Sequence, residues 1–306
     1  MMKKIVVTGP TGAIGIALIA HCIQQNVEVY ALCRRGSKRR ERIPTHPLVH
    51  VVECNLEEMR NLPTTDMPTV DVFYHLGWDA TIGDGRNDMY LQLKNVQYTL
   101  DAVELAARLG CQAFVGAGSQ AEYGRFEGSL NGQVPTFPEN GYGIAKLCAG
   151  QMSRSQCHKH GIKHIWTRIL SVYGPNDSEK TMIFTTIQKL LNGERPSLTK
   201  GEQKWDYLYC GDAAKALFLL GEKGKANKTY CIGSGKAIPL IEYIQILRDK
   251  INPKAELGIG EIPYGEKQVM YLCADISELT TDTGFVPKVS FEEGIENTIQ
   301  WMKSRK

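Results

Sequence analysis

The chain has 306 residues, of which 42% are hydrophobic and 23% charged, a composition that supports a folded enzyme with a substantial core. Lys and Arg number 36 against 33 Asp and Glu, and residues 34–42 alone hold six basic groups and one acid, so a general nucleic-acid-binding surface is excluded. No apolar run reaches the ~18 residues of a membrane span and the N-terminus lacks a signal-peptide pattern, so we expect a cytoplasmic protein that binds no membrane. The nine cysteines form no Cys-x-x-Cys pair, so we expect reduced thiols.

Short apolar runs alternate with helical patterns through the first half of the chain. This alternation predicts a doubly wound α/β fold, a parallel sheet covered on both faces by helices. We expect helices from the glycine-rich turn to about Gln24, after Asp88 and from near Tyr142. The expected strands cover residues 4–8, 27–33, 48–53, 70–76, 113–116 and 165–170.

The rhythm changes after about Leu170, where prolines, glycines and short helices dominate. Helical patterns return over residues 212–223 and 291–302. We therefore expect a dinucleotide-binding Rossmann domain over residues 1–170, to which residues 207–232 return. Residues 171–306 are expected to form a smaller α+β lobe that shapes the substrate site.

A glycine-rich turn follows the first expected strand, in Thr8-Gly-Pro-Thr-Gly-Ala-Ile-Gly15. Between a strand and a helix, such glycines allow a sharp turn, the approach of a pyrophosphate and close packing of the helix. A purely structural tight turn is the alternative. The expected cofactor contacts here are Gly9, Thr11, Gly12, Ala13, Ile14 and Gly15.

The end of the second expected strand indicates which dinucleotide is bound. An NAD enzyme usually places Asp or Glu there, whereas this chain has Arg34 and Arg35, which could bind the 2′-phosphate of NADP. We therefore predict NADP rather than NAD, although a solvated basic loop is the alternative, as for residues 38–42. Further cofactor contacts are expected at Asn55, where the side chain could reach the adenine, and at Leu56, Leu76, Gly77, Leu170 and Val172.

Three side chains form a candidate catalytic set. Tyr142 and Lys146 lie four residues apart, on one face of an expected helix, where the ammonium would lower the pKa of the phenol toward the working range. Ser119 follows the fifth expected strand, at the end of the sheet where doubly wound folds bind ligands. Proton exchange by Tyr142 at neutral pH is therefore predicted.

These motifs together resemble the extended short-chain dehydrogenases/reductases, in particular the NAD-dependent epimerase/dehydratase family that acts on nucleotide sugars. The resemblance extends over the whole chain, through TGPTGAIG, HLGW, GSQAEYG, YGIAK, RILSVYGP, WDYLYCGDAAKAL, YCIGSG and GFVPKVSFEEGI. It implies that Ser119 bonds the reacting sugar oxygen, Tyr142 exchanges the proton and Lys146 holds the nicotinamide ribose. It also implies a homodimer formed by the two long helices, those of Asn95 and Tyr142.

Several departures from the family pattern narrow the reaction. The acidic pair that follows the Ser in 4,6-dehydratases is Gln120-Ala121 here, which disfavours a dehydratase. Ser171 and Trp205 replace an Asn and an Arg that tend to contact the diphosphate in relatives, so Lys204 or Lys267 would have to substitute. The expected substrate contacts are Trp78, Ser119, Gln120, Ser171, Trp205 and Lys267.

The sequence leaves three functions open. The first is an NADPH-dependent reductase of a 4-keto nucleotide sugar, because the Ser-x-x-Glu-Tyr-Gly variant is similar to that of the CDP-abequose synthase type. The second is a nucleotide-sugar 4-epimerase that retains NAD(P), and the third is a non-catalytic NADP-sensing protein. No metal is expected despite the histidines near Cys157, and His75 and Glu122 are interpreted as a structural histidine and a solvated loop carboxylate.

Overall fold

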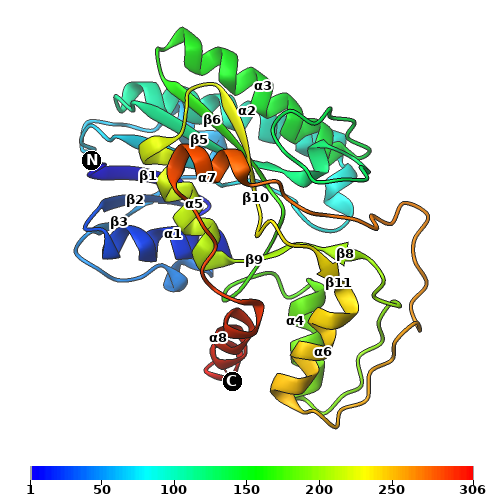
Figure 1. Ribbon diagram of the computed structural model, residues 1–306. Helices are drawn as coiled ribbons and strands as arrows, with labels where there is room; N and C mark the ends of the chain where they lie inside the picture. Colours follow the sequence, from blue (N-terminus) through cyan, green and yellow to red (C-terminus); the bar gives the residue numbers. More distant parts are fainter. Residues whose placement is uncertain (1, 306) are drawn as a thin grey trace.

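The computed structural model describes residues 2–305, which are organised around a seven-stranded parallel sheet (Figure 1). The strands lie in the order β10-β6-β5-β4-β1-β2-β3. Their bounds are β1 Lys4–Thr8, β2 Glu28–Cys33, β3 Val49–Glu53, β4 Val72–His75, β5 Ala113–Ser119, β6 Lys163–Ile169 and β10 Lys228–Ile232. The doubly wound fold predicted from the sequence is confirmed.

The order of the strands reverses at β1. From β1 the chain continues to β2 and β3 on one side, and β4 then starts the other side of the sheet. Thr8, the last residue of β1, lies in register with His75, the last residue of β4. Connections that leave these two strands in opposite directions open a crevice at their carboxyl ends, where ligands bind in folds of this kind.

Helices cover both faces of the sheet (Figure 1). On one face α1 Ala13–Gln24 packs against α5 Cys210–Lys223, and on the other α2 Met89–Arg108 packs against α3 Gly141–Lys159. The short helix α7 Ser277–Thr283 lies beside α5 and β10. Four single turns complete this part, η1 Arg40–Arg42, η2 Leu56–Asn61, η3 Asp84–Asn87 and η4 Gln120–Glu122.

The second half of the chain adds a smaller α+β lobe. Helices α4 Met182–Leu191, α6 Leu240–Ile251 and α8 Phe291–Lys303 share an apolar cluster centred on Ile187, Leu247 and Ile295. Two short ladders accompany them: β7 Ser171–Tyr173 pairs with β9 Tyr207–Tyr209, and β8 Lys204–Trp205 with β11 Ile238–Pro239.

Asp206 ties this lobe to the end of the sheet. Its side chain is fully buried and accepts hydrogen bonds from the Ser234 N–H and hydroxyl at 2.7 Å, from the Gly235 N–H at 3.1 Å and from the Ala274 N–H at 3.0 Å. Buried carboxylates persist where several donors satisfy them. One side chain between β8 and β9 therefore holds together segments that are distant in the sequence.

The fifth strand is longer than the sequence indicated, because it continues past Gly116 to Ser119. Gly116 and Gly118 are poor strand formers, but a Cβ at Gly116 would lie 2.3 Å from the Trp166 ring. The small residues make room for this indole from the neighbouring strand. In residues 2–305, no helix combines the length and the apolar character that crossing a bilayer requires.

Candidate active site

A pocket lies at the carboxyl ends of β1, β4, β5 and β6, over the crevice described above. It gathers twelve of the side chains or backbone positions that the sequence singled out. These are Gly9, Gly12, Ala13, Ile14, Gly15, Leu76, Trp78, Ser119, Tyr142, Lys146, Leu170 and Val172. Sequence reasoning missed five further lining residues, namely Thr81, Ala117, Gly118, Ile169 and Asp177.

The glycine-rich turn has the shape of a phosphate cradle. Gly9 has a φ of +67°, which L side chains rarely adopt, and a Cβ at Gly15 would lie 2.3 Å from the Gly9 oxygen. Gly12 is the N-cap of α1 and no side chain caps this end of the helix. The first-turn N–H groups and the positive end of the helix dipole therefore face the pocket, where a pyrophosphate would satisfy them.

Thr8 fixes the floor of this crevice. Its hydroxyl oxygen accepts hydrogen bonds from the backbone N–H groups of Leu76 at 3.1 Å and Gly77 at 2.9 Å, and it lies 3.0 Å from Nδ1 of His75. The other ring nitrogen of His75 lies 3.3 Å from the Thr99 hydroxyl. Burial lowers the pKa of His75 to about 3, so this histidine is neutral and serves as a buried link, in line with the structural interpretation.

The three candidate catalytic residues meet in the pocket. Ser119 ends β5, and Tyr142 lies in the first turn of α3, where the Asn140 side chain accepts the Gly143 N–H at 2.9 Å. The Ser119 side chain lies near enough to the Tyr142 hydroxyl to lower the pKa of that phenol. Lys146 follows one helical turn later, with its ammonium 5.7 Å from the centre of the Tyr142 ring. The i, i+4 spacing therefore places both functional groups on the pocket side of α3.

Burial shifts the pKa values of Tyr142 and Lys146 in opposite directions. It raises the pKa of Tyr142, while the Ser119 side chain and the guanidinium of Arg86, 4.5 Å above the ring, act against this rise. Burial lowers the pKa of Lys146 to about 7, although its ammonium donates a 2.6 Å hydrogen bond to the Ala117 carbonyl. Burial therefore favours the neutral form of both side chains, and a ligand that brings charges or polar partners to them would shift both pKa values.

Trp78 forms one wall of the pocket and also supports Lys146. The Lys146 ammonium lies 3.7 Å from the centre of the indole ring, and the ring meets Tyr142 edge-on with centres 6.0 Å apart. The indole N–H donates to Gln92 at 2.9 Å, and Asn95 bonds both backbone groups of Asp79. Helix α2 therefore holds the loop after β4 against the candidate catalytic side chains.

Arg34 and Arg35, the predicted 2′-phosphate contacts, lie outside this pocket and differ in their hydrogen bonds and ion pairs. The Arg35 guanidinium pairs with Glu58 at 3.2 Å, and the Arg35 N–H donates to the Asn55 side chain at 3.2 Å. Arg34 is exposed, and its guanidinium has no hydrogen bond or ion pair with any residue between 2 and 305. Of the two arginines, only Arg34 is therefore uncommitted.

Several sequence-based expectations on the substrate side take a different form in the structure. Ser171 and Trp205 bond each other, with the indole N–H donating to the serine hydroxyl at 2.7 Å. Glu122 is not a solvated loop carboxylate, because its side chain is fully buried by Trp166 and Arg168. The expected contacts that do not line the pocket are Thr11, Arg34, Arg35, Asn55, Leu56, Gly77, Gln120, Ser171, Trp205 and Lys267. Asp177 does line it, although the sequence did not single it out.

The depressed pKa of Lys146 predicts a particular dependence of stability on pH. Because the folded-state pKa lies near 7 and the unfolded value near 10.5, the unfolded chain binds one more proton between these values. Stability should therefore rise with pH in this window. Urea unfolding at pH 6.5 and pH 9.5 should show wild type gaining on the order of 3 kcal/mol relative to Lys146→Met. Lys200→Met, at an exposed position, should run parallel to wild type; equal slopes for all three proteins would contradict the assignment.

Comparison with known proteins shows the family of this chain. Residues 5–233 match the NAD dependent epimerase/dehydratase family. Among curated relatives, a Methanocaldococcus jannaschii protein provisionally named UDP-glucose 4-epimerase is 26% identical over 98% of both chains.

Solved structures share the fold along the whole chain. The UDP-N-acetylglucosamine 4-epimerase of Methanobrevibacter ruminantium, in complex with UDP-N-acetylmuramic acid, gives a TM-score of 0.89 at 22% identity and covers 100% of this chain and 99% of its own. The UDP-glucuronic acid 4-epimerase of Bacillus cereus, with UDP-glucuronic acid and NAD, gives 0.84 at 20% identity, covering 99% and 100%. With three quarters of its length matched by the family pattern, the chain belongs to the NAD-dependent epimerase/dehydratase family.

Proposed function

We propose that the protein is a nucleotide-sugar 4-epimerase. The observation that carries the proposal is the pocket itself, in which Ser119, Tyr142 and Lys146 face the phosphate cradle while Gln120 and Ala121 stand where a dehydratase has its acidic pair. Epimerases among the relatives and the matched structures support the same reaction. The Tyr-based proton exchange also explains why a non-catalytic sensor is the poorest of the three hypotheses.

The residues of this chain suit a bound dinucleotide. The uncapped first turn of α1 and the open side of Gly12 would hold its pyrophosphate, and Lys146 is placed to bond the ribose next to the nicotinamide. When bound, the nicotinamide supplies a reversible hydride acceptor for the sugar carbon. Ser119 would orient the sugar hydroxyl by a hydrogen bond. Tyr142 would accept the proton of that hydroxyl and return it once the sugar presents its other face.

A second candidate function, reduction of a 4-keto nucleotide sugar, is favoured by one observation. No acid ends β2, and Arg34 is free to bind a 2′-phosphate, which suits NADP(H) that exchanges between turnovers. The Bacillus cereus epimerase structure contains NAD, which favours a retained cofactor. The two functions share the same proton donor and differ in whether hydride returns to the carbon that lost it.

The fate of the sugar separates these two functions. Incubation with UDP-hexoses should interconvert the C4 epimers without net change in NADPH absorbance, and chromatography of the sugars would measure it. Tyr142→Phe should lower this rate by about 10²–10⁴-fold, because the proton exchange is lost. Tyr98→Phe, on α2 outside the pocket, is the matched control and should retain full activity. Stoichiometric NADPH oxidation by 4-keto sugars, with no epimerisation, would establish the reductase instead.

The cofactor prediction concerns Arg34. Arg34→Ser should lower the ratio of NADP to NAD affinity by about tenfold, the value of one charge-assisted bond of about 1.4 kcal/mol. Arg35→Ser should change the ratio less, because Glu58 already pairs with its guanidinium. Titration calorimetry with both cofactors measures the ratio. A wild type that prefers NAD, with a ratio indifferent to Arg34, would refute the 2′-phosphate assignment.

We also propose that the protein forms a homodimer through α2 and α3, the helices of Asn95 and Tyr142. These helices pack side by side and expose large apolar side chains to solvent. Tyr90 is 84% and Leu93 65% exposed on α2, and Ile144 and Met152 are half-exposed on α3. Apolar side chains of this size gathered on a folded surface are typical of an interface.

The dimer proposal predicts that charged substitutions on the exposed apolar face of α2 prevent dimer formation. The double variant Tyr90→Glu/Leu93→Glu should sediment as a monomer, because two charges on each protomer would have to be buried. Ile262→Glu, at another exposed apolar position but in the second lobe, should leave the mass unchanged. Analytical ultracentrifugation of the three proteins measures the difference. A wild type that sediments as a monomer at micromolar concentration would remove the proposal.

A further inference from the structure

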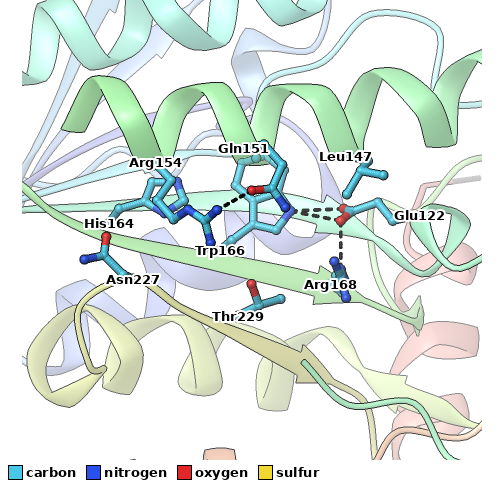
Figure 2. Close-up of a pocket in the computed structure, with 10 residues that line it drawn as sticks. Glu122, Leu147, Gln151, Arg154, His164, Trp166, Arg168, Asn227 and Thr229 are labelled. Carbon is cyan, nitrogen blue, oxygen red and sulfur yellow. Dashed lines mark hydrogen bonds and ion pairs between the residues drawn. The ribbon is translucent and has the colours of Figure 1, made fainter. Parts of the chain in front are cut away.

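Behind the catalytic serine lies a buried carboxylate to which no role has been assigned. Glu122 is the last residue of η4, three positions after Ser119, and its side chain is 0% exposed. Its Oε1 accepts the backbone N–H of Ser119 at 2.8 Å and the Trp166 indole N–H at 3.0 Å. Its Oε2 accepts Nε of Arg168 at 2.8 Å, as Figure 2 shows from the side of the neighbouring cavity.

The strands around Glu122 are built to hold this carboxylate. A Cβ at Gly118 would lie 2.3 Å from Oε1 of Glu122, so the glycine before the serine leaves space for the carboxylate. Trp166 and Arg168 are alternate residues of β6 and point to the same face of the sheet. The Arg168 guanidinium lies 4.5 Å above the Tyr123 ring. Donors on a central strand therefore fix Glu122 from the side opposite to the serine.

The arrangement is more than a buried ion pair. Arg168 contacts Glu122 through Nε, and its Nη1 atom is buried with no partner among residues 2–305. One donor of the guanidinium therefore stays unpaired among the described residues, which costs free energy that a fully satisfied ion pair would not. The observed geometry instead leaves Oε1 of Glu122 directed at the backbone N–H of Ser119.

The bond to the Ser119 N–H acts on the catalytic hydroxyl. In return, the Ser119 oxygen accepts the Ala121 N–H at 3.2 Å, which closes the turn from both ends. This reciprocal pair sets the backbone and the rotamer of Ser119, whose side chain lines the same pocket as Tyr142 and lowers its pKa. The negative charge of Glu122 also raises the pKa of Tyr142 and of Lys146, so it acts on the other two members of the catalytic set.

We propose that Glu122, held by Trp166 and Arg168, is a positioning residue that fixes the Ser119 hydroxyl for proton exchange with Tyr142. This rests on the proposed function of Ser119 in the reaction. Glu122 does not line the pocket of Tyr142 and Lys146, so it does not touch a ligand placed there. Its main contribution is therefore made through the serine, and this distinguishes it from a residue that only stabilises the fold.

A double-mutant cycle with Ser119 tests this directly. Glu122→Gln should lower kcat about tenfold with little change in KM, because a misplaced hydroxyl affects the chemical step rather than binding. In a Ser119→Ala background, the same change should lower kcat less than about twofold, since there is no hydroxyl left to position. An equal loss in both backgrounds would show that Glu122 acts independently of the serine and would overturn the proposal.

A rescue variant guards against loss of folding. In Glu122→Gln, the new amide can place its N–H₂ group against the Nε donor of Arg168, so that two donors face each other. Arg168→Gln removes this conflict, because its side-chain oxygen can lie where Nε lies in the wild type. The double variant Glu122→Gln/Arg168→Gln therefore keeps an acceptor for the Ser119 N–H and should recover kcat to within about threefold of wild type. Glu139→Gln, which breaks an exposed pair with Arg125, is the matched control and should have no effect. Failure of the rescue in a protein with wild-type thermal stability would count against positioning.

One readout does not depend on the substrate. Hydrogen exchange of peptides from residues 113–122 should be faster in Glu122→Gln than in wild type, with the α3 peptides unchanged, because the bond from the Ser119 N–H is weakened. If no nucleotide sugar is turned over by wild type, the proposed function fails while this measurement still reports on Glu122. Unchanged exchange over residues 113–122 would refute the contact itself.

Discussion

The two hydrogen bonds that Thr8 accepts from Leu76 and Gly77 hold the crevice on which the rest of the site depends. They lie where β1 and β4 end side by side and their connections diverge, so the chain after each strand is fixed relative to the other. The phosphate turn follows one strand and the Trp78 loop follows the other. The glycine-rich turn and the wall that supports Lys146 are therefore positioned by one threonine hydroxyl, with the neutral His75 behind it.

Burial is the second determinant of the site. The same exclusion of water that raises the pKa of Tyr142 lowers that of Lys146, so neither charged form is favoured without a partner. A dinucleotide would bring its own charges and polar groups to these side chains. The protein supplies the fixed dipoles in advance, through the Ala117 carbonyl, the Trp78 ring and the end of α1. A preorganised site of this kind suits a reaction in which one proton moves out and back.

The sequence was informative wherever the signal is local. Apolar runs located most strands of the sheet, although the end of β5 was missed because the strand continues through two glycines. The glycine spacing and the Tyr-x-x-x-Lys pair located most of the pocket. Contacts between distant residues left no such signal. Glu122 looked like a loop acid because Trp166 and Arg168, which bury it, lie more than forty positions away. The Arg35–Glu58 pair and the Asp177 lining position were missed for the same reason.

The bond between Trp205 and Ser171 changes how the departures from the family pattern should be understood. Considered one at a time, a Trp for an Arg and a Ser for an Asn each remove a contact that relatives tend to make with the diphosphate. In the structure these two side chains bond each other at 2.7 Å, so the changes form one compensated pair rather than two losses. The indole N–H is thereby committed to the serine and cannot also serve a phosphate oxygen. In the proposed reaction, recognition of a diphosphate would then have to come from backbone N–H groups or from lysines of the second lobe, and Ser119 and Tyr142 would locate the reacting sugar.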